Sequence, residues 1–132
     1  MKIQLLSDTH GFDYDIAKEA DVVVHAGDFS NSLRGMVDFA DCCKDLNKDF
    51  IFVLGNHDYF DSNIEDTLNF LRDNYPNNAL LYDNAVKIKN KVFVGGTLFT
   101  NFRANKLQYD DPIAFDTAKR FAEDYVYDFS KV

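Results

Sequence analysis

The sequence has few cysteines, few basic residues and no long apolar run, and each shortage excludes a class of protein. Its two cysteines, Cys42 and Cys43, are adjacent, so they are poorly placed for a disulfide and lack the paired spacing of a zinc knuckle. No stretch has the roughly 18 apolar residues of a membrane span, and no basic-then-apolar segment resembles a signal peptide. We therefore expect a cytoplasmic protein with reduced thiols that does not enter a membrane.

Basic residues are also in the minority. Lys and Arg number 14 against 22 Asp and Glu, which gives a net charge of −8. Such a chain repels phosphate backbones, which argues against non-specific nucleic-acid binding, although a bound metal would reverse the repulsion locally. Tryptophan is absent, yet hydrophobic residues make up 46% of the 132 residues, enough for the core of one domain.

Three short apolar runs predict buried strands, at Ile3–Leu6, Val22–Val24 and Phe50–Leu54. Ser32 is expected to cap a helix whose apolar positions continue to Cys43 at helical spacing. Ser62 and Glu65 form a capping-box pattern before another helix. Strand–helix–strand–helix–strand–helix over residues 1–75 is the pattern of an α/β fold with a parallel-core sheet flanked by helices.

After Pro76 the pattern changes to an antiparallel meander. Residues 79–82, 85–88 and 92–94 are expected to be short strands, with Lys89-Asn90-Lys91 as a hairpin turn. A last helix is expected near residues 111–128, because Asp111-Pro112 precedes a helical apolar pattern. We see no repeat, low-complexity stretch or linker, so residues 1–132 are expected to form a single domain.

Each predicted parallel strand is followed by a polar motif, and the carboxyl ends of such strands are where ligands bind. The motifs are Asp8-Thr9-His10, Gly27-Asp28 and Gly55-Asn56-His57-Asp58.

The residue types in these motifs suit a metal centre. Asp8 and His10 are expected on one side of a strand end, and a carboxylate with an imidazole suits Mn²⁺, Fe or Zn²⁺. Asp28 could bridge two metals, and Asn56 offers an amide oxygen. His57 could protonate a leaving alkoxide while Asp58 orients it.

Taken singly, each motif could be an ordinary turn with exposed polar residues. Their order behind three strands favours metal-dependent phosphoester chemistry.

The three motifs resemble the first three signatures of the calcineurin-like metallophosphoesterases. The segment Gly95-Gly96-Thr97-Leu98-Phe99-Thr100 is also similar to a Gly-x-Thr-Leu-Trp-Thr segment in a subgroup of small predicted phosphohydrolases. The resemblance implies two sheets packed face to face with helices outside, and hydrolysis of a phosphoester by a metal-bound hydroxide.

The resemblance also implies roles for residues. Asp8, His10 and Asp28 would hold a first metal, and Asp28 and Asn56 a second. His57 would be the general acid, supported by Asp58. The divalent metals implied are Mn, Fe, Zn or Ni, in a dinuclear centre.

The sequence departs from the family pattern in its histidines. The pattern continues with a later His and a Gly-His-x-His, but this sequence has only His10, His25 and His57. We therefore expect a domain that is incomplete at its C-terminal side. The ligands present suffice for one metal, so a mononuclear centre is the alternative to the dinuclear one. His25 is not expected to replace a ligand, because alternation along its strand turns it away from Asp28.

Three interpretations follow from these observations. The chain is a phosphoester hydrolase, a weak or inactive relative that serves as a binding or assembly module, or one part of a split enzyme. Half of a two-sheet sandwich leaves an apolar face open, and the sequence has 13 Phe to bury. We therefore expect a homo-oligomer or a partner that covers the open sheet after residue 80.

Overall fold

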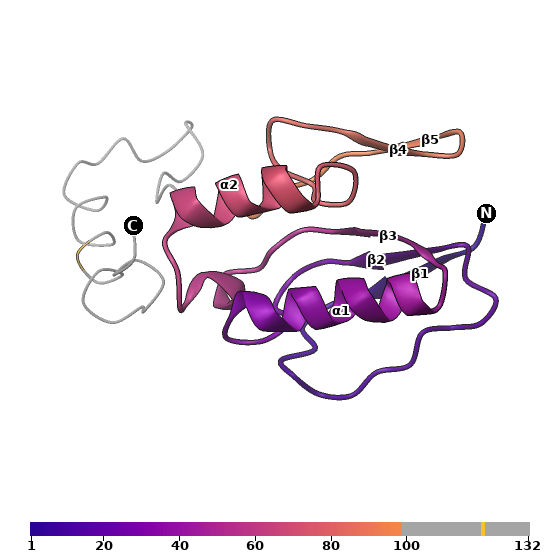
Figure 1. Ribbon diagram of the computed structural model, residues 1–132, viewed down its shortest axis with the longest axis horizontal. Helices are drawn as coiled ribbons and strands as arrows, with labels where there is room; N and C mark the ends of the chain where they lie inside the picture. Colours follow the sequence, from indigo (N-terminus) through magenta and orange to yellow (C-terminus); the bar gives the residue numbers. More distant parts are fainter. Residues whose placement is uncertain (99–119, 121–132) are drawn as a thin grey trace, which may run out of the picture. The chain divides into compact units, whose positions relative to one another are not determined.

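The computed structural model of the chain describes residues 1–98 and Arg120. Residues Met1–Thr97 form one compact unit, and Leu98–Val132 form a second, of which only Leu98 and Arg120 are described. The described elements of the first unit, in chain order, are β1 (Ile3–Leu6), β2 (Val22–His25), α1 (Leu33–Asp45), β3 (Asp49–Phe52), the short 3-10 helix η1 (His57–Tyr59), α2 (Ile64–Asn74), β4 (Val86–Ile88) and β5 (Lys91–Phe93) (Figure 1).

The three apolar runs form one parallel sheet, as the sequence predicts. The strand order is β1-β2-β3, with Ile3 opposite Val22 and Val22 opposite Asp49. All three strands therefore end at the same edge, where the polar motifs follow.

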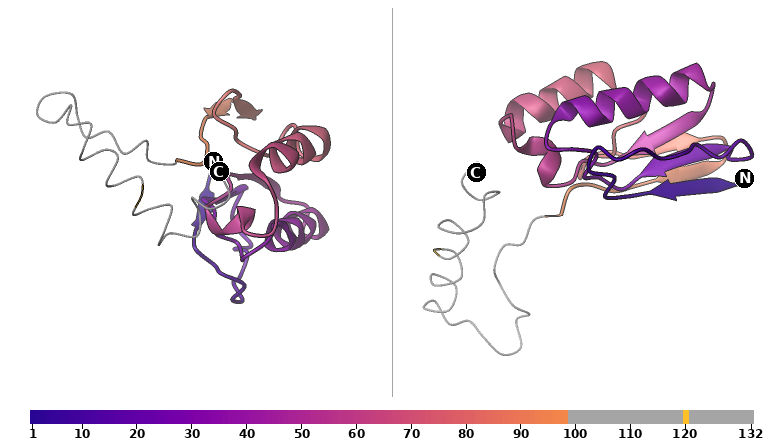
Figure 2. Two further views of the ribbon diagram at one scale, coloured as in Figure 1. Left: turned by 90° about the vertical axis from the view of Figure 1, so that its left-hand side faces the viewer. Right: turned by 90° about the horizontal axis from the view of Figure 1, so that it is seen from below.

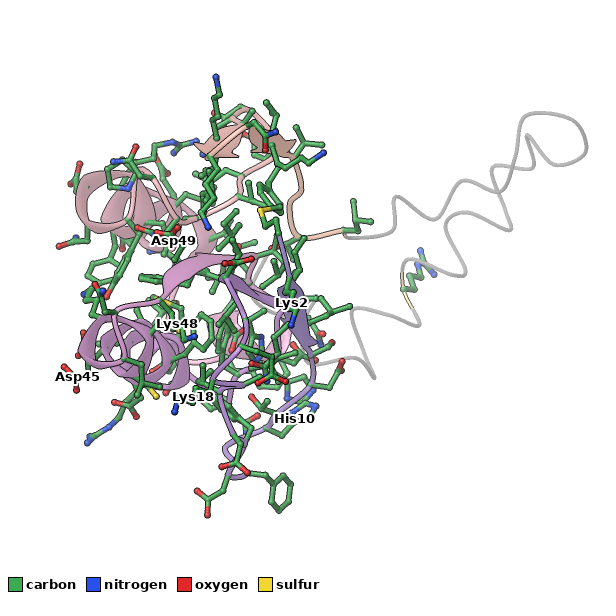
Figure 3. All side chains as sticks on the ribbon, turned by 90° about the vertical axis from the view of Figure 1, so that its right-hand side faces the viewer. Lys2, His10, Lys18, Asp45, Lys48 and Asp49 are labelled. Carbon is green, nitrogen blue, oxygen red and sulfur yellow. The ribbon has the colours of Figure 1, made fainter. Side chains whose placement is uncertain are left out.

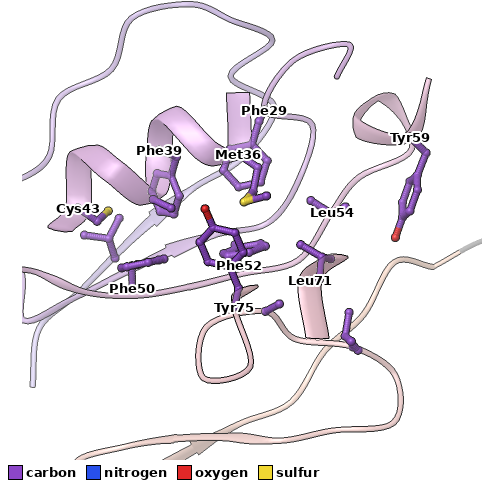
Figure 4. Close-up of a cluster of buried hydrophobic side chains, with 14 residues drawn as sticks. Phe29, Met36, Phe39, Cys43, Phe50, Phe52, Leu54, Tyr59, Leu71 and Tyr75 are labelled. Carbon is purple, nitrogen blue, oxygen red and sulfur yellow. The ribbon is translucent and has the colours of Figure 1, made fainter. Parts of the chain in front are cut away.

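Both helices lie on one face of this sheet (Figure 2). Phe50 and Phe52 point to that face and pack with Phe39 of α1 and Leu71 of α2 in the main core (Figure 4). Burial of these large side chains, each worth roughly 1.5–3 kcal/mol, fixes the helices on the sheet.

The two helices begin close to where the sequence predicts. Ser32 caps α1, because its side chain accepts a hydrogen bond from the backbone N–H of Arg34. The N-cap of α2 is Asn63, not the expected Ser62: the Asn63 side chain accepts from the N–H of Asp66, while the Ser62 hydroxyl bonds to Thr67. Asn and Ser are about equally favourable as N-cap residues, so the sequence alone does not distinguish Asn63 from Ser62 as the N-cap of α2.

The helix expected between the first two strands is absent, and residues 7–21 form an irregular crossover. The side-chain amide of Gln4 binds this segment at two points, donating to the carbonyl of Asp15 and accepting from the N–H of Ala17, both at 2.7 Å. Lys48 donates to the carbonyl of Lys18 at 2.6 Å (Figure 3). Side chains thus satisfy backbone groups that a helix would have paired internally.

The meander is confirmed in part. β4 and β5 pair antiparallel around a tight turn at Lys89, whose φ is +54°. Residues 79–82 do not form the expected strand, and Ala79 makes only an isolated parallel bridge with Phe52. The side chain of Asn84 holds this segment in a turn instead, through the N–H of Leu81 and the carbonyl of Ala79. The helix expected near residues 111–128 lies outside the described residues, apart from Arg120.

The second face of the sheet is covered only in part. Ile51 packs there with Leu80 and Val86. Ile3 and Leu5 of the edge strand β1 are 49% and 69% exposed. Among the described residues, no helix is long and apolar enough to cross a membrane.

Candidate metal centre

The first two motifs lie side by side because the parallel pairing continues beyond the strands. The backbone N–H of Asp8 donates to Gly27 at 3.0 Å, and that of His10 donates to Asp28 at 3.0 Å. The Asp8-x-His10 segment is therefore aligned with Gly27-Asp28 by backbone hydrogen bonds.

Two glycines let the second and third motifs approach closely. Gly27 has a φ of +97°, and a Cβ there would lie 2.5 Å from the backbone N of Gly55. A Cβ on Gly55 would overlap the carboxylate of Asp28. Any larger residue at either position would push the loops apart.

Asp58 joins these two loops. Its carboxylate is fully buried and accepts backbone N–H bonds from Asp28, Phe29, Ser30 and Gly55, at 2.9, 2.9, 3.2 and 2.9 Å. Burial raises the pKa of Asp58 to about 6, although the N–H donors oppose the rise. The carboxylate is therefore ionised at neutral pH and fixes the spacing between Asp28 and the third motif.

The side chains of His10, Asp28 and His57 converge beyond the strand ends. Each offers a ligand atom, and these atoms lie within 4.8 Å of one another. His10 Nε2 is 3.9 Å from Asp28 Oδ2 and equally far from Asp8 Oδ1. The side chain of Asp28 is only 14% exposed, whereas that of Asp8 is 67% exposed. Three of the expected site residues, His10, Asp28 and His57, thus converge, while Asp8 lies outside this group and is near His10.

The reason for the convergence of Asp8 and His10 differs from the predicted one. Strand alternation does not apply, because both residues lie beyond β1 with φ values of +52° and +47°. Asp28 has a φ of +57°. Non-glycine residues seldom adopt this left-handed conformation, and such strain is concentrated at functional sites.

The partner of His57 also differs from the predicted one. Asp58 was expected to orient this imidazole, but its carboxylate is occupied by the four backbone donors. His57 Nδ1 instead lies 2.8 Å from Oδ1 of Asn31. Asn31 belongs to no predicted motif, and no signal in the sequence singles it out, because its contact joins two loops 26 residues apart.

Asn56 precedes η1 and is held between two fixed neighbours. The N–H of Gly55 donates to Asp58, and the N–H of His57 donates to Asp28 Oδ1 at 3.1 Å. Thr97 of the Gly95-Gly96-Thr97 segment donates to the carbonyl of Leu54 at 2.6 Å. The fourth resembling segment therefore supports the loop that carries Asn56.

His25 is not directed into the centre, as expected from alternation. It is fully buried, stacks on Phe29 and uses both ring nitrogens: Nε2 lies 3.1 Å from Thr9 Oγ1, and Nδ1 accepts from the N–H of Gly27 at 3.2 Å. Burial lowers its pKa to about 4. His25 is thus a neutral core histidine that supports the Gly27-Asp28 loop.

The donor set at the centre fits a divalent metal. The Asp28 carboxylate and the imidazoles of His10 and His57 converge there, and the Asp8 carboxylate lies 3.9 Å from His10 Nε2. Such mixed oxygen and nitrogen ligands suit Mn²⁺, Fe or Zn²⁺. Among the described residues, no other group of three or more His, Cys, Asp and Glu side chains has this arrangement.

Comparison with known proteins agrees with this geometry. The family model for calcineurin-like phosphoesterases matches residues 1–129. No curated protein and no solved structure matched the chain. The match covers nearly the whole chain and includes all three motifs, so this chain belongs to the calcineurin-like phosphoesterase family.

Proposed function

We propose that this chain is a metal-dependent phosphoester hydrolase. Asp8, His10, Asp28 and Asn56 would hold the metal, and His57 would donate a proton to the leaving group. The observation that carries the proposal is the convergence of His10, Asp28 and His57 at the carboxyl edge of the parallel sheet, in a chain of a phosphoesterase family.

The metal and the residues of the chain would have different roles in the reaction. When bound, a divalent ion would supply Lewis-acid polarisation of the phosphoryl group and an activated water. Among the proposed ligands, Asp28 is held at both ends: its backbone N–H donates to Asp58, and its Oδ1 accepts from the N–H of His57. The N–H of His57 is bonded to the Asp28 carboxylate, which places the imidazole beside any ester bound there.

His57 is well placed as the general acid. Its ring lies 4.8 Å from that of His10, centroid to centroid, and packs on Phe60 at 4.4 Å. A proton donor matters most when the departing oxygen is strongly basic. Loss of this donor should therefore slow esters with basic leaving groups more than esters with acidic ones, whereas loss of folding would slow both equally.

The test is Mn²⁺-dependent hydrolysis of two esters by the purified chain. His57→Asn should lose on the order of 10²-fold on an alkyl phosphate but much less on p-nitrophenyl phosphate, whose leaving group needs little protonation. Asp28→Asn should abolish turnover of both, and Asp41→Asn, which removes a carboxylate from the surface of α1, should not.

Two outcomes would count against the proposal. Equal losses on both esters would remove His57 from the role of acid. Mn²⁺ binding without turnover of any ester would support the alternatives, a non-catalytic binding or assembly module or one part of a split enzyme.

A further inference from the structure

The loop that follows β3 carries Asn56 and His57, and the residues at its two ends are buried. Leu54 precedes the loop and is 3% exposed, and Tyr59 ends it and is 5% exposed (Figure 4). Within the loop, the N–H of His57 donates to the Asp28 carboxylate. That bond fixes one backbone group, and the shape of the loop also depends on how its ends are held.

Thr97 binds both ends of this loop. Its hydroxyl donates to the carbonyl of Leu54 at 2.6 Å and lies 3.2 Å from the hydroxyl of Tyr59. A carbonyl oxygen only accepts, so the single hydroxyl hydrogen of Thr97 is used there and Tyr59 must donate the second bond. Burial raises the pKa of Tyr59, which keeps its hydroxyl protonated for this role. We call these two hydrogen bonds, from Tyr59 to Thr97 and from Thr97 to Leu54, the Thr97 bridge.

Thr97 reaches the loop from a closely packed segment that is distant in sequence. It lies 43 residues beyond Leu54 along the chain. A Cβ on Gly96, the residue before it, would lie only 3.0 Å from the backbone N of Tyr82. Contacts this short leave the segment little freedom to shift. The position of Thr97 is therefore set by the fold, and its hydroxyl can hold the loop in place.

The chemistry of the bridge requires a hydroxyl at position 97, because the same group must donate one hydrogen bond and accept another. Valine has the shape of threonine but can do neither, so Thr97→Val removes both bonds with little change in volume. Serine keeps the hydroxyl, so Thr97→Ser retains the bridge. Tyr59→Phe removes one bond and leaves the other. These variants separate the hydrogen bonds of the bridge from the packing around it.

We propose that Thr97 is a positioning residue for the centre, which holds Asn56 and His57 beside Asp28 by bridging the two ends of their loop. The consequence for metal binding and turnover rests on the function proposed above. The consequence for the order of the loop in the metal-free chain does not.

The first test is amide hydrogen exchange, measured by NMR on the metal-free full chain. The N–H of His57 reports on the loop, and that of Ala26, which donates to Leu6 within the parallel sheet at 2.8 Å, reports on the fold as a whole. Thr97→Val should accelerate exchange at His57 by on the order of tenfold more than at Ala26. Thr97→Ser should match wild type, and Tyr59→Phe should lie between the two. Tyr82→Phe, at a tyrosine that is 79% exposed, is the control and should change neither amide.

The second test is Mn²⁺ titration and turnover of the same variants. Thr97→Val should weaken Mn²⁺ binding by on the order of tenfold, as is typical when a group that holds a metal ligand in place is removed. At saturating Mn²⁺, its kcat should fall further on an alkyl phosphate than on p-nitrophenyl phosphate, because a displaced His57 protonates the leaving oxygen poorly. Thr97→Ser should restore both properties.

The outcomes separate this inference from the proposed function. Equal acceleration at His57 and Ala26 in Thr97→Val would show that Thr97 only stabilises the fold, and would overturn the inference. Loss of the same size in Thr97→Ser would overturn it too, because the hydroxyl would then not matter. If Thr97→Val does not fold, Tyr59→Phe decides by the same comparison. Absence of Mn²⁺ binding or turnover in wild type, with the exchange pattern as expected, would overturn the proposed function while supporting the role of Thr97 in holding the loop.

Discussion

At the scale of single residues, the candidate metal ligands carry strained backbone. Asp8, His10 and Asp28 all have φ between +47° and +57°. A left-handed conformation costs a non-glycine residue roughly 1–2 kcal/mol. The surrounding hydrogen bonds, such as that from the N–H of His10 to Asp28, hold the residues in this conformation. Stability is thus given up locally where the proposed function needs the side chains to converge.

This strain predicts an inverted order of two variants at position 10. In the middle of a helix or strand, a protein with Gly is ordinarily less stable than the same protein with Ala by about 0.5–1 kcal/mol. We expect metal-free His10→Gly to be more stable than His10→Ala by about 1 kcal/mol, because only Gly adopts the positive φ freely. Both should lose metal affinity alike. Urea unfolding in the presence of a chelator measures the difference, and a more stable Ala variant would show that position 10 is not strained.

His25 predicts a pH dependence of stability. Its pKa is lowered from 6.5 to about 4 by burial, so between these values the unfolded chain binds the extra proton and the folded chain does not. The contribution of neutral His25 to the free energy of unfolding is complete above pH 6.5 and is lost as the pH falls toward 4. The total loss is on the order of 3 kcal/mol. The free energy of unfolding, measured with urea at several pH values from neutral to acid, should therefore fall more steeply with decreasing pH for wild type than for His25→Gln. Equal slopes would contradict a neutral, buried His25.

At the scale of elements, the centre depends on the close approach of two loops. Gly55→Ala would place a methyl group against the Asp28 carboxylate. We expect a loss of about 1–3 kcal/mol in the free energy of unfolding, together with weaker metal binding, since Asp28 must move.

Gly11→Ala is the matched control for Gly55→Ala. Gly11 has a φ of +79° with no atom near its missing Cβ, so Ala there brings strain without a clash. It should lose about 1 kcal/mol and keep more of the metal affinity. Chemical unfolding and Mn²⁺ titration of both variants compare the two effects. Equal metal affinities would show that the spacing of these loops does not control the centre.

The elements also show what the sequence could predict. The β-branched run of β2 and the aromatic run of β3 identify these two strands because continuous apolar runs are typical of strands buried on both faces. The first run also forms a strand, but it was expected to be buried, whereas Ile3 and Leu5 are exposed at the edge of the sheet. Local patterns could not reveal that Gln4 would bind the crossover from the side or that Asn84 would turn residues 79–82. In each case one polar side chain binds backbone groups: Gln4 reaches residues 11 and 13 positions away, and Asn84 binds groups three and five positions away. Neither contact follows from an apolar pattern.

The same limit applied to the site. Spacing behind strands identified Asp8, His10, Asp28 and His57 as neighbours. It assigned Asp58 to His57, because adjacent residues are the nearest candidates. Only the folded loops show that Asp58 binds four backbone N–H groups and that Asn31 is the partner of His57.

At the scale of the whole molecule, the partly covered sheet face predicts association. Ile3 and Leu5 expose apolar surface on the edge strand β1, whose outer edge pairs with no other strand among the described residues. We expect the chain to form a dimer through this face and Leu5→Lys to shift it toward monomers. Leu46→Lys, at an exposed leucine that ends α1, should not. Light scattering over a range of concentrations measures this, and a monomer throughout would contradict it.

Metal binding links all three scales and tests the central claim most directly. Elemental analysis of the purified chain after Mn²⁺ loading and desalting should give about one ion per chain or more. Loading should also raise the melting temperature, by linkage to the folded state. Asp28→Asn should lose both the ion and the stabilisation, whereas Asp41→Asn should keep both. Absence of bound metal in wild type, or equal metal content in wild type and Asp28→Asn, would contradict a metal centre at the carboxyl edge of this sheet.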